Sequence, residues 1–247
     1  MITFGSLFAG IGGFDLGFER AGMVPKWQVE IDPWCRRVLA KHWPHVERKA
    51  DIRECSGHNL RTPDVLCGGF PCQDVSHSGK RDGINGARSG LWFEYSRIIR
   101  ELQPRYVVIE NVPGLLVRGF DAVLGELAQS GYDAEWDCFP ASAFGCYHER
   151  DRLFIVAYSA SLHRDSRYLL GAGQDWRAQA KFGRLRRMVD ATERRERNTR
   201  FELEPRLDRL VDGVPDRSHR LGALGNSIVP QVAEFIGRQI VRDVGGV

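Results

Sequence analysis

The chain has 247 residues, of which 43% are hydrophobic, and its 35 Lys and Arg residues and 32 Asp and Glu residues leave a net charge of +3. This size and apolar content predict a soluble protein with a hydrophobic core, and no run of about 18 apolar residues is present to cross a membrane. The N-terminus lacks the basic flank and cleavage site of a signal peptide, so we expect a cytoplasmic protein. Six cysteines form no C-x-x-C pair, which favours reduced thiols and argues against a structural metal site.

Strand-like and helical patterns alternate along the first part of the chain. Residues 2–8 alternate as a strand does and lead into the glycine-rich turn AGIGG, and the apolar spacing that follows indicates a helix ending at Gly22. KWQVEI (26–31) is predicted as a second strand, with Pro33 in the first turn of the next helix. The unit of strand, turn and helix is then repeated.

Further strands are predicted at DVLCGG (64–69), RYVVIEN (105–111), DAEWDCF (133–139) and RLFIVAY (152–158). Between the first two, GLWFEYSRIIREL (90–102) carries the single apolar stripe of a buried helix. Alternating strands and helices joined by short Gly or Pro turns predict an α/β fold. We expect a Rossmann-like, doubly wound, mainly parallel sheet with helices on both faces.

The strand and helix rhythm stops between about 160 and 220, where arginine dominates. Residues 161–200 hold eleven Arg or Lys against five acids, so this stretch carries +6 and the remainder of the chain −3. Such a stretch is either a solvated surface or a lobe that contacts phosphates. After it, the apolar stripe of residues 229–240 predicts a last helix that packs back on the sheet.

Polar residues stand where the predicted strands end, which is where open α/β sheets bind ligands. Glu30 lies about 20 residues after FAGIGG, the separation at which a carboxylate can bind the ribose of a nucleoside. Asp15 occupies the place of the third glycine of a dinucleotide-binding turn. This departure argues against a dinucleotide ligand and is compatible with a mononucleoside ligand such as S-adenosylmethionine.

Cys72 lies after a strand and a glycine turn, in the segment GGFPCQDVS (68–76). A free cysteine is usually a small buried apolar residue. The glycine-rich polar segment that follows Cys72 instead carries Lys80, Arg81 and Arg88, and nearby cations lower the pKa of a thiol. We interpret Cys72 as a candidate nucleophile.

Glu110 ends an apolar strand, where an unpaired carboxylate is costly to bury. It either serves a site or caps the turn that begins at Asn111. Arg150 and Arg152 have period two, so both face the same side of a strand. Their guanidinium groups are well shaped to bind a carbonyl oxygen or phosphates. The alternative is that they form a structural salt bridge.

Six segments together resemble, in order and spacing, the motifs of DNA (cytosine-5)-methyltransferases. They are FAGIGG (8–13), EID (30–32), GGFPCQ (68–73), ENV (110–112), the R-x-R of HERDR (148–152) and GNS (225–227). The resemblance covers residues 1–158 and 221–242 and is to the compact bacterial or phage type. It implies a catalytic and cofactor-binding domain (1–159), a small inserted target-recognition lobe (160–220) and a C-terminal segment returning to the first domain (221–247).

The resemblance also implies a mechanism. Cys72 would add to C6 of a cytosine flipped out of duplex DNA, so that C5 becomes able to accept a methyl group from S-adenosylmethionine. Glu110 would hold the base at N3 and the exocyclic amine, Arg152 would contact O2, and Arg150 would support the site. The loop after Cys72 would close over the base.

The same resemblance implies the binding residues. Glu30 would bind the ribose, Asp51 with Ile52 the adenine, and Asn226 with Ser227 the methionine end. The complete set expected for the cofactor is Phe8, Ala9, Gly10, Gly12, Gly13, Glu30, Ile31, Asp51, Ile52, Gly69, Pro71, Leu91, Asn226 and Ser227. The DNA contacts expected are Gln73, Ser76, Lys80, Arg81, Arg88, Arg184, Arg186 and Arg187. No metal is expected.

The expected partner is double-stranded DNA, bound by a monomer of bacterial or phage origin, with a restriction endonuclease as a candidate associate. Two departures from the family pattern stand before the R-x-R, where His148 replaces a glutamine and Cys146 with Tyr147 replace Val-Pro. Three alternatives stay open: an RNA cytosine methyltransferase of the transfer-RNA type, a catalytically silent DNA-binding relative, and a nicotinamide-dependent oxidoreductase of similar fold.

Overall fold

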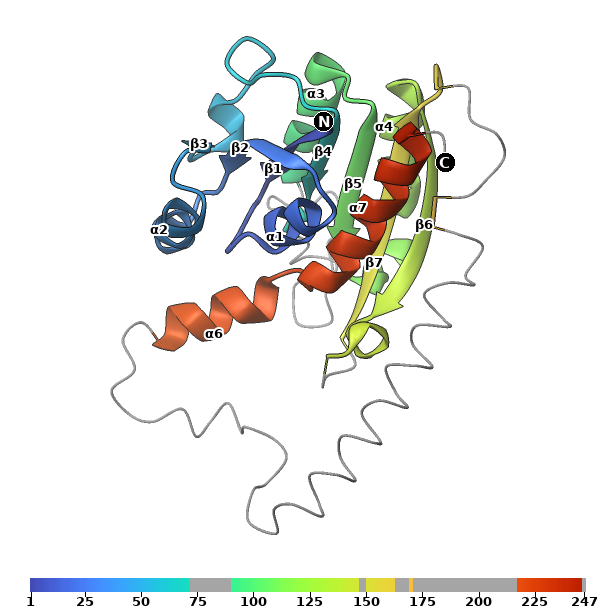
Figure 1. Ribbon diagram of the computed structural model, residues 1–247. Helices are drawn as coiled ribbons and strands as arrows, with labels where there is room; N and C mark the ends of the chain where they lie inside the picture. Colours follow the sequence, from blue (N-terminus) through green and yellow to red (C-terminus); the bar gives the residue numbers. More distant parts are fainter. Residues whose placement is uncertain (72–89, 147–149, 163–168, 171–216, 246–247) are drawn as a thin grey trace, which may run out of the picture.

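A computed structural model of the chain describes residues 1–71, 90–146, 150–162, 169–170 and 217–245 (Figure 1). The described residues form a seven-stranded sheet in the order β3-β2-β1-β4-β5-β7-β6. Its strands are β1 (Thr3–Leu7), β2 (Val24–Val29), β3 (Glu47–Lys49), β4 (Val65–Gly68), β5 (Tyr106–Asn111), β6 (Tyr132–Pro140) and β7 (Asp151–Ser159). The first five strands pair in parallel, and β7 is antiparallel to both β5 and β6.

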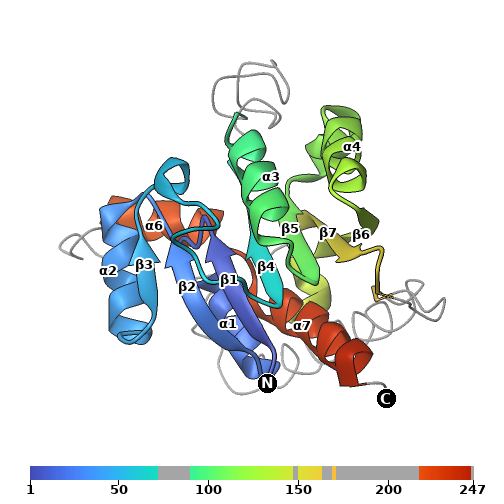
Figure 2. The same ribbon diagram turned by 90° about the horizontal axis from the view of Figure 1, so that it is seen from above.

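Helices cover both faces of the sheet, which confirms the predicted doubly wound α/β class. The helices are α1 (Gly13–Arg20), α2 (Pro33–His42), α3 (Leu91–Leu102), α4 (Phe120–Gln129), α6 (Arg217–Asn226) and α7 (Pro230–Gly245), with short 3₁₀ turns η1 (Ile52–Glu54), η3 (Pro113–Val117) and η4 (Ala141–Phe144). Figure 2 shows α3 and α4 on one face and α1 and α7 on the other. Each pair buries its own apolar cluster against the sheet.

The predicted strands and helices form because their apolar spacing matches the surfaces they cover. On α3, Tyr95, Ile98, Ile99 and Leu102 are buried as the stripe predicts, and Trp92 is buried with them. The strand β3 was not predicted, because its three residues, ERK, are polar and short. It pairs with β2 at the edge of the sheet, where exposed charged side chains are tolerated.

The last helix packs directly on the first. A Cβ atom placed at Gly17 of α1 would lie 2.5 Å from both the Ala233 Cβ and the Pro230 carbonyl oxygen of α7. On α7, Val232, Ala233 and Ile236 are buried against the sheet. The end of the chain therefore returns to its beginning, on the face opposite to α3 and α4 (Figure 2).

Within the described ranges, no helix combines the length and the apolar content needed to cross a bilayer. Most of the lobe predicted at 160–220 lies outside the described residues.

Candidate active site

Glu110 lies at the carboxyl end of the interior strand β5, and the residue is 8% exposed. The antiparallel register pairs Asn111 with Leu153, so Arg152 of β7 lies just beyond the end of β5. The Nε atom of Arg152 is 2.8 Å from Glu110 Oε1. The antiparallel pairing of β7 with β5 therefore brings Arg152 to Glu110 at this end of the sheet.

Arg150 lies directly before β7 and completes a cluster of one carboxyl group and two guanidinium groups. Its Nη1 donates to the Leu224 carbonyl oxygen of α6 at 3.5 Å. Its Nε is buried and has no hydrogen-bond partner among the residues that the structure describes. Burial lowers the pKa of Arg150, and the charge of Arg152 lowers it further. Within the described residues, the cluster therefore contains one guanidinium donor without a partner.

The protonation of Glu110 is set by opposing effects. Burial raises the pKa of Glu110 to about 7, against the attraction of Arg152 and Arg150, which lowers it. A carboxyl group with this pKa holds its proton over a large part of the neutral pH range. It can then donate one hydrogen bond as well as accept others.

The exit of β4 runs directly past Glu110. A Cβ atom at Gly69 would lie 2.5 Å from Glu110 Oε2, so a larger residue there would require the Glu110 carboxyl group to move. Asn111 Nδ2 donates to the Phe70 carbonyl oxygen at 3.2 Å, and Val112 N donates to Asn111 Oδ1 at 2.8 Å. Phe70 and Pro71, which precede Cys72 in the sequence, are thus held beside the cluster.

The glycine-rich turn after β1 is fixed to the end of β2 by Glu30. Gly10 N donates to Glu30 Oε2 at 2.6 Å, and Asp32 N donates to Glu30 Oε1 at 2.8 Å. The turn passes through the left-handed region at Gly10 (φ 55°) and Gly12 (φ 88°), which glycine adopts at little cost. Phe8 also has a positive φ of 52°. Each Glu30 oxygen keeps a lone pair, so the carboxylate is oriented but can still accept from a hydroxyl.

Ser227 lies against this turn, although it is more than 200 residues away in the sequence. A Cβ atom at Gly13 would lie 3.0 Å from Ser227 Oγ and 2.6 Å from the Ile228 carbonyl oxygen. Asn226 ends α6 and is exposed. The return of α7 to α1 therefore brings the predicted GNS segment to the predicted cofactor turn.

Asp51 follows β3 and caps the 3₁₀ turn η1, accepting from Arg53 N at 2.9 Å. Its carboxylate is also paired with the exposed Arg53 guanidinium, which lowers the pKa of Asp51. Ile52 is buried in the apolar cluster under α3, whereas Ile31, after Glu30, is 62% exposed. Leu91 opens α3 and packs at the edge of the same cluster.

The remaining predicted residues lie outside the described part of the chain. They are Cys72, Gln73, Ser76, Lys80, Arg81, Arg88, Arg184, Arg186 and Arg187. Within the described part, no group of three or more His, Cys, Asp or Glu residues is arranged to hold a metal ion.

A buried polar network beside the glycine turn was missed in the sequence. Asp15 is fully buried, and its carboxylate accepts from Gln28 Nε2 at 2.8 Å and from Ser6 Oγ at 3.1 Å. Burial raises the pKa of Asp15 to about 6. The signal that could have found this network is Gln28 itself, a polar residue in the middle of an apolar strand.

A family model for the C-5 cytosine-specific DNA methylases matches residues 2–206. The chain belongs to this family. The resemblance stated from the motifs is therefore confirmed.

Curated relatives of the chain are bacterial type II methyltransferases. M.FnuDI from Fusobacterium nucleatum is 37% identical over 162 residues, which are 64% of this chain and 47% of the relative. M2.BsuMI from Bacillus subtilis is 34% identical over 160 residues, which are 62% of this chain and 41% of the relative. The chain thus matches less than half the length of these methyltransferases.

Among solved structures, a protein assigned as a DNA modification methyltransferase encoded within a prophage (E. coli) has 28% sequence identity and a TM-score of 0.58. The superposition covers 67% of this chain and 49% of that one. The fold described above therefore corresponds to the fold of this solved structure.

Proposed function

We propose that the protein methylates C5 of cytosine in duplex DNA, with S-adenosylmethionine as methyl donor. The observation that carries this proposal is the buried Glu110, paired with Arg152 at 2.8 Å, next to the chain that leads from Phe70 and Pro71 to Cys72. A protonated carboxyl group beside guanidinium donors fits the N3, exocyclic amine and O2 edge of cytosine. The type II methyltransferases among the relatives support DNA as the substrate.

The residues of the turn and of the strand ends fit the methyl donor. Glu30 would accept from the ribose hydroxyls, because its oxygens are already oriented by Gly10 N and Asp32 N. The Asp51–Ile52 segment would meet the adenine, and Asn226 with Ser227 the methionine end. The remaining expected contacts line the path between these groups, at Phe8, Ala9, Gly12, Gly13, Ile31, Gly69, Pro71 and Leu91. When bound, S-adenosylmethionine supplies an electrophilic methyl group on a sulfonium.

The chain's own groups would activate the base in three steps. The Cys72 thiolate forms a bond to C6, which moves electron density toward C5, N3 and O2. Glu110 donates its proton at N3, and Arg152, supported by Arg150, donates a hydrogen bond to O2, so the added charge is offset. After C5 has received the methyl group and S-adenosylhomocysteine has formed, a water molecule would accept the C5 proton. The electron pair of the C5–H bond would form the C5–C6 double bond, Cys72 would leave as a thiolate, and N3 would return its proton to Glu110.

The target atoms are shielded inside a duplex, so the base has to be flipped into the site. Gln73, Ser76, Lys80, Arg81 and Arg88 follow Cys72 closely in the sequence and are proposed to contact the DNA. We assign target recognition to the arginine-rich lobe of residues 160–220. Action as a monomer, a cytoplasmic location and pairing with a restriction endonuclease belong to the same proposal.

Bisulfite sequencing of DNA and RNA from cells that express the protein tests the activity, the nucleic-acid type and the sequence context together. The wild-type protein should protect cytosines in one short context, and Cys72→Ala should protect none. Protection that persists in Cys72→Ala would remove the nucleophile assignment. Methylated RNA with unmodified DNA would support the transfer-RNA alternative, and no methylation of either would support a catalytically silent relative.

A further inference from the structure

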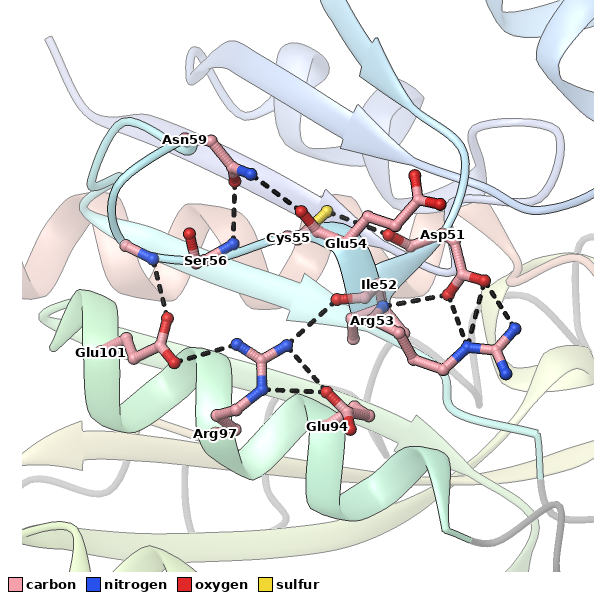
Figure 3. Close-up of polar contacts among 11 residues, drawn as sticks. Asp51, Ile52, Arg53, Glu54, Cys55, Ser56, Asn59, Glu94, Arg97 and Glu101 are labelled. Carbon is pink, nitrogen blue, oxygen red and sulfur yellow. Dashed lines mark hydrogen bonds and ion pairs between the residues drawn. The ribbon is translucent and has the colours of Figure 1, made fainter.

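Arg97 of α3 connects this helix to the loop of residues 51–59, which carries the proposed adenine contacts Asp51 and Ile52 (Figure 3). Its Nη2 donates to the carbonyl oxygen of Ile52 at 3.2 Å, across 45 positions of sequence. The same guanidinium is held in place by Glu94, at 2.7 Å from Nη2, and by Glu101, at 2.9 Å from Nη1. The guanidinium group of Arg97 therefore donates both to residues of α3 and to the loop.

Glu101 provides a second link between α3 and the same loop. While one of its oxygens faces Arg97, Oε2 accepts from the backbone N of Gly57 at 2.8 Å. The backbone of Gly57 lies so close to α3 that a Cβ atom there would be 3.3 Å from the Glu101 carbonyl oxygen. Arg97 and Glu101 therefore fasten the loop near its two ends.

Hydrogen bonds within the loop also connect its own residues to one another. Cys55 Sγ donates to the Asp51 carbonyl oxygen at 3.3 Å, Asn59 Nδ2 donates to the Glu54 carbonyl oxygen at 2.8 Å, and Ser56 N donates to Asn59 Oδ1 at 2.8 Å (Figure 3). Because these bonds connect the residues of one short segment, we expect it to move as a unit. A shift at Ile52 is then transmitted to the neighbouring Asp51.

A solvated helix surface would explain part of this arrangement. Glu94, Arg97 and Glu101 have the i,i+3 and i,i+4 spacings of ordinary helical ion pairs, each of which stabilises a helix by a few tenths of a kcal/mol. A helix-surface pair has no need of the contacts to Ile52 and Gly57. These contacts give the Arg97 side chain a role outside its own helix.

We propose that Arg97 is a positioning residue for the cofactor, which sets the place of the Asp51–Ile52 segment against the adenine ring. The inference rests on the proposed function, in which this segment meets the adenine. Arg97 acts through the Ile52 carbonyl oxygen and does not itself contact the ligand. Within the proposed function, the Asp51 carboxylate is the group of this segment that can accept a hydrogen bond from the 6-amino group of adenine. Because a displacement of about 1 Å is enough to weaken well-oriented contacts strongly, loss of the Ile52 hydrogen bond should weaken that contact.

The chain offers a matched control in Arg100. Arg100 lies on the same helix and is also held in an ion pair, but its Nη1 contacts Glu126 of α4 and Ser96 Oγ instead of the loop. Replacing either arginine by glutamine removes one charge from α3. The two variants differ in whether the loop of residues 51–59 loses a contact.

The test is isothermal titration of the full chain with two ligands. One is S-adenosylhomocysteine, and the other is S-inosylhomocysteine, which carries an oxygen in place of the 6-amino group. Arg97→Gln should weaken binding of the adenosyl ligand on the order of tenfold and change binding of the inosyl ligand by less than about twofold. Arg97→Lys, which keeps the charge but loses the planar fork, should fall between. Arg100→Gln should change neither.

Equal weakening of both ligands by Arg97→Gln, or the same losses in Arg100→Gln, would mean that Arg97 only stabilises the fold and would overturn the proposal. Unchanged binding in Arg97→Gln would overturn it as well. In each of these cases the wild-type protein still binds the adenosyl ligand, so the proposed function stands. A wild-type chain that binds neither ligand would contradict the proposed function and, with it, the role of Arg97.

The kinetic signature separates positioning from chemistry. Arg97→Gln should raise the KM for S-adenosylmethionine on the order of tenfold and leave kcat within about twofold, because the reacting groups at Glu110 and Cys72 are untouched. A fall in kcat with an unchanged KM would contradict the proposal.

Discussion

In the proposed mechanism, the protonation of a single buried carboxyl group decides how the base can be held. Because the pKa of Glu110 is raised to about 7 by burial, the folded protein binds this proton more tightly than the unfolded chain does. The protonated form prevails below about pH 7, and it is lost as the pH rises through that value. If Glu110 binds the base as proposed, a proton donor to N3 is present near neutral pH and is lost at higher pH.

Glu110→Gln separates hydrogen bonding from proton donation. A glutamine amide can still donate to N3 and accept from the exocyclic amine, but it cannot release a proton. We expect the wild-type rate to decrease above pH 7. In Glu110→Gln, single-turnover methyl transfer should be slower by about 10² and should lack this decrease. Rates measured from pH 6 to 9 test this, and a decrease of the same size above pH 7 in both proteins would exclude Glu110 as its source.

Part of the site could be predicted at the level of single residues. The places of Glu110 at a strand end and of Arg150 and Arg152 on one side of a strand follow from local patterns, whereas the contact between Glu110 and Arg152 depends on the register of β5 and β7. The network of Asp15, Ser6 and Gln28 and the contact between Arg97 and Ile52 could not be predicted, since they depend on side-chain directions across separate elements. The capping role of Asp51 was one of two foreseen alternatives, and its role toward adenine stays a prediction.

At the scale of elements, the packing of α7 on α1 connects the fold to the site. Gly17 is the point of closest approach, and Ser227 and Ile228, just before α7, lie against Gly13 at the start of α1. A side chain at Gly17 must therefore push α7 away and draw Ser227 from the glycine turn. Stability and cofactor affinity should change together.

Gly17→Ala should lower the free energy of unfolding by about 1–3 kcal/mol and weaken binding of S-adenosylhomocysteine. The control is Gly125→Ala on α4, where an added Cβ meets no atom within 4 Å among the described residues. Alanine there should stabilise the protein by about 0.4–1 kcal/mol. Urea unfolding and ligand titration measure both effects, and similar behaviour of the two variants would refute the close-packing explanation.

The sequence was sufficient for the long, regular elements and insufficient for the edges of the sheet. The strand β5 is buried along its whole length, and its nearly continuous apolar sequence predicts it. β3 was missed because its pairing with β2 is made by the backbone and leaves polar side chains outside. The antiparallel direction of β7 is set by pairing between distant strands, which no local pattern encodes.

At the scale of the whole molecule, the charge is divided between two parts. Residues 161–200 carry +6 and the rest of the chain carries −3. If this stretch contacts phosphates, reversing Arg186 and Arg187 to Glu should weaken DNA binding, and more so at low salt than at high salt. Reversal of Arg238 and Arg242, on α7, makes the same change of charge outside the lobe and should have little effect.

Fluorescence anisotropy with labelled duplex DNA at several salt concentrations measures both double variants. A smaller slope of log affinity against log salt is expected for the lobe variant alone. Equal slopes for both variants would mean that only the net charge matters. An unchanged affinity of the lobe variant at every salt concentration would make the arginine-rich stretch a solvated surface.

The covalent bond between Cys72 and a cytosine ring is the step on which the proposed mechanism depends, and a suicide substrate captures it directly. In duplex DNA with 5-fluorocytosine at the methylated position, no C5 proton can leave after methyl transfer, so the protein should stay attached to the DNA. With S-adenosylmethionine, the wild-type chain should form a complex that survives boiling in detergent, and Cys72→Ala should form none. An equally stable complex in Cys72→Ala, or none in a wild-type protein that methylates unmodified DNA, would contradict the account.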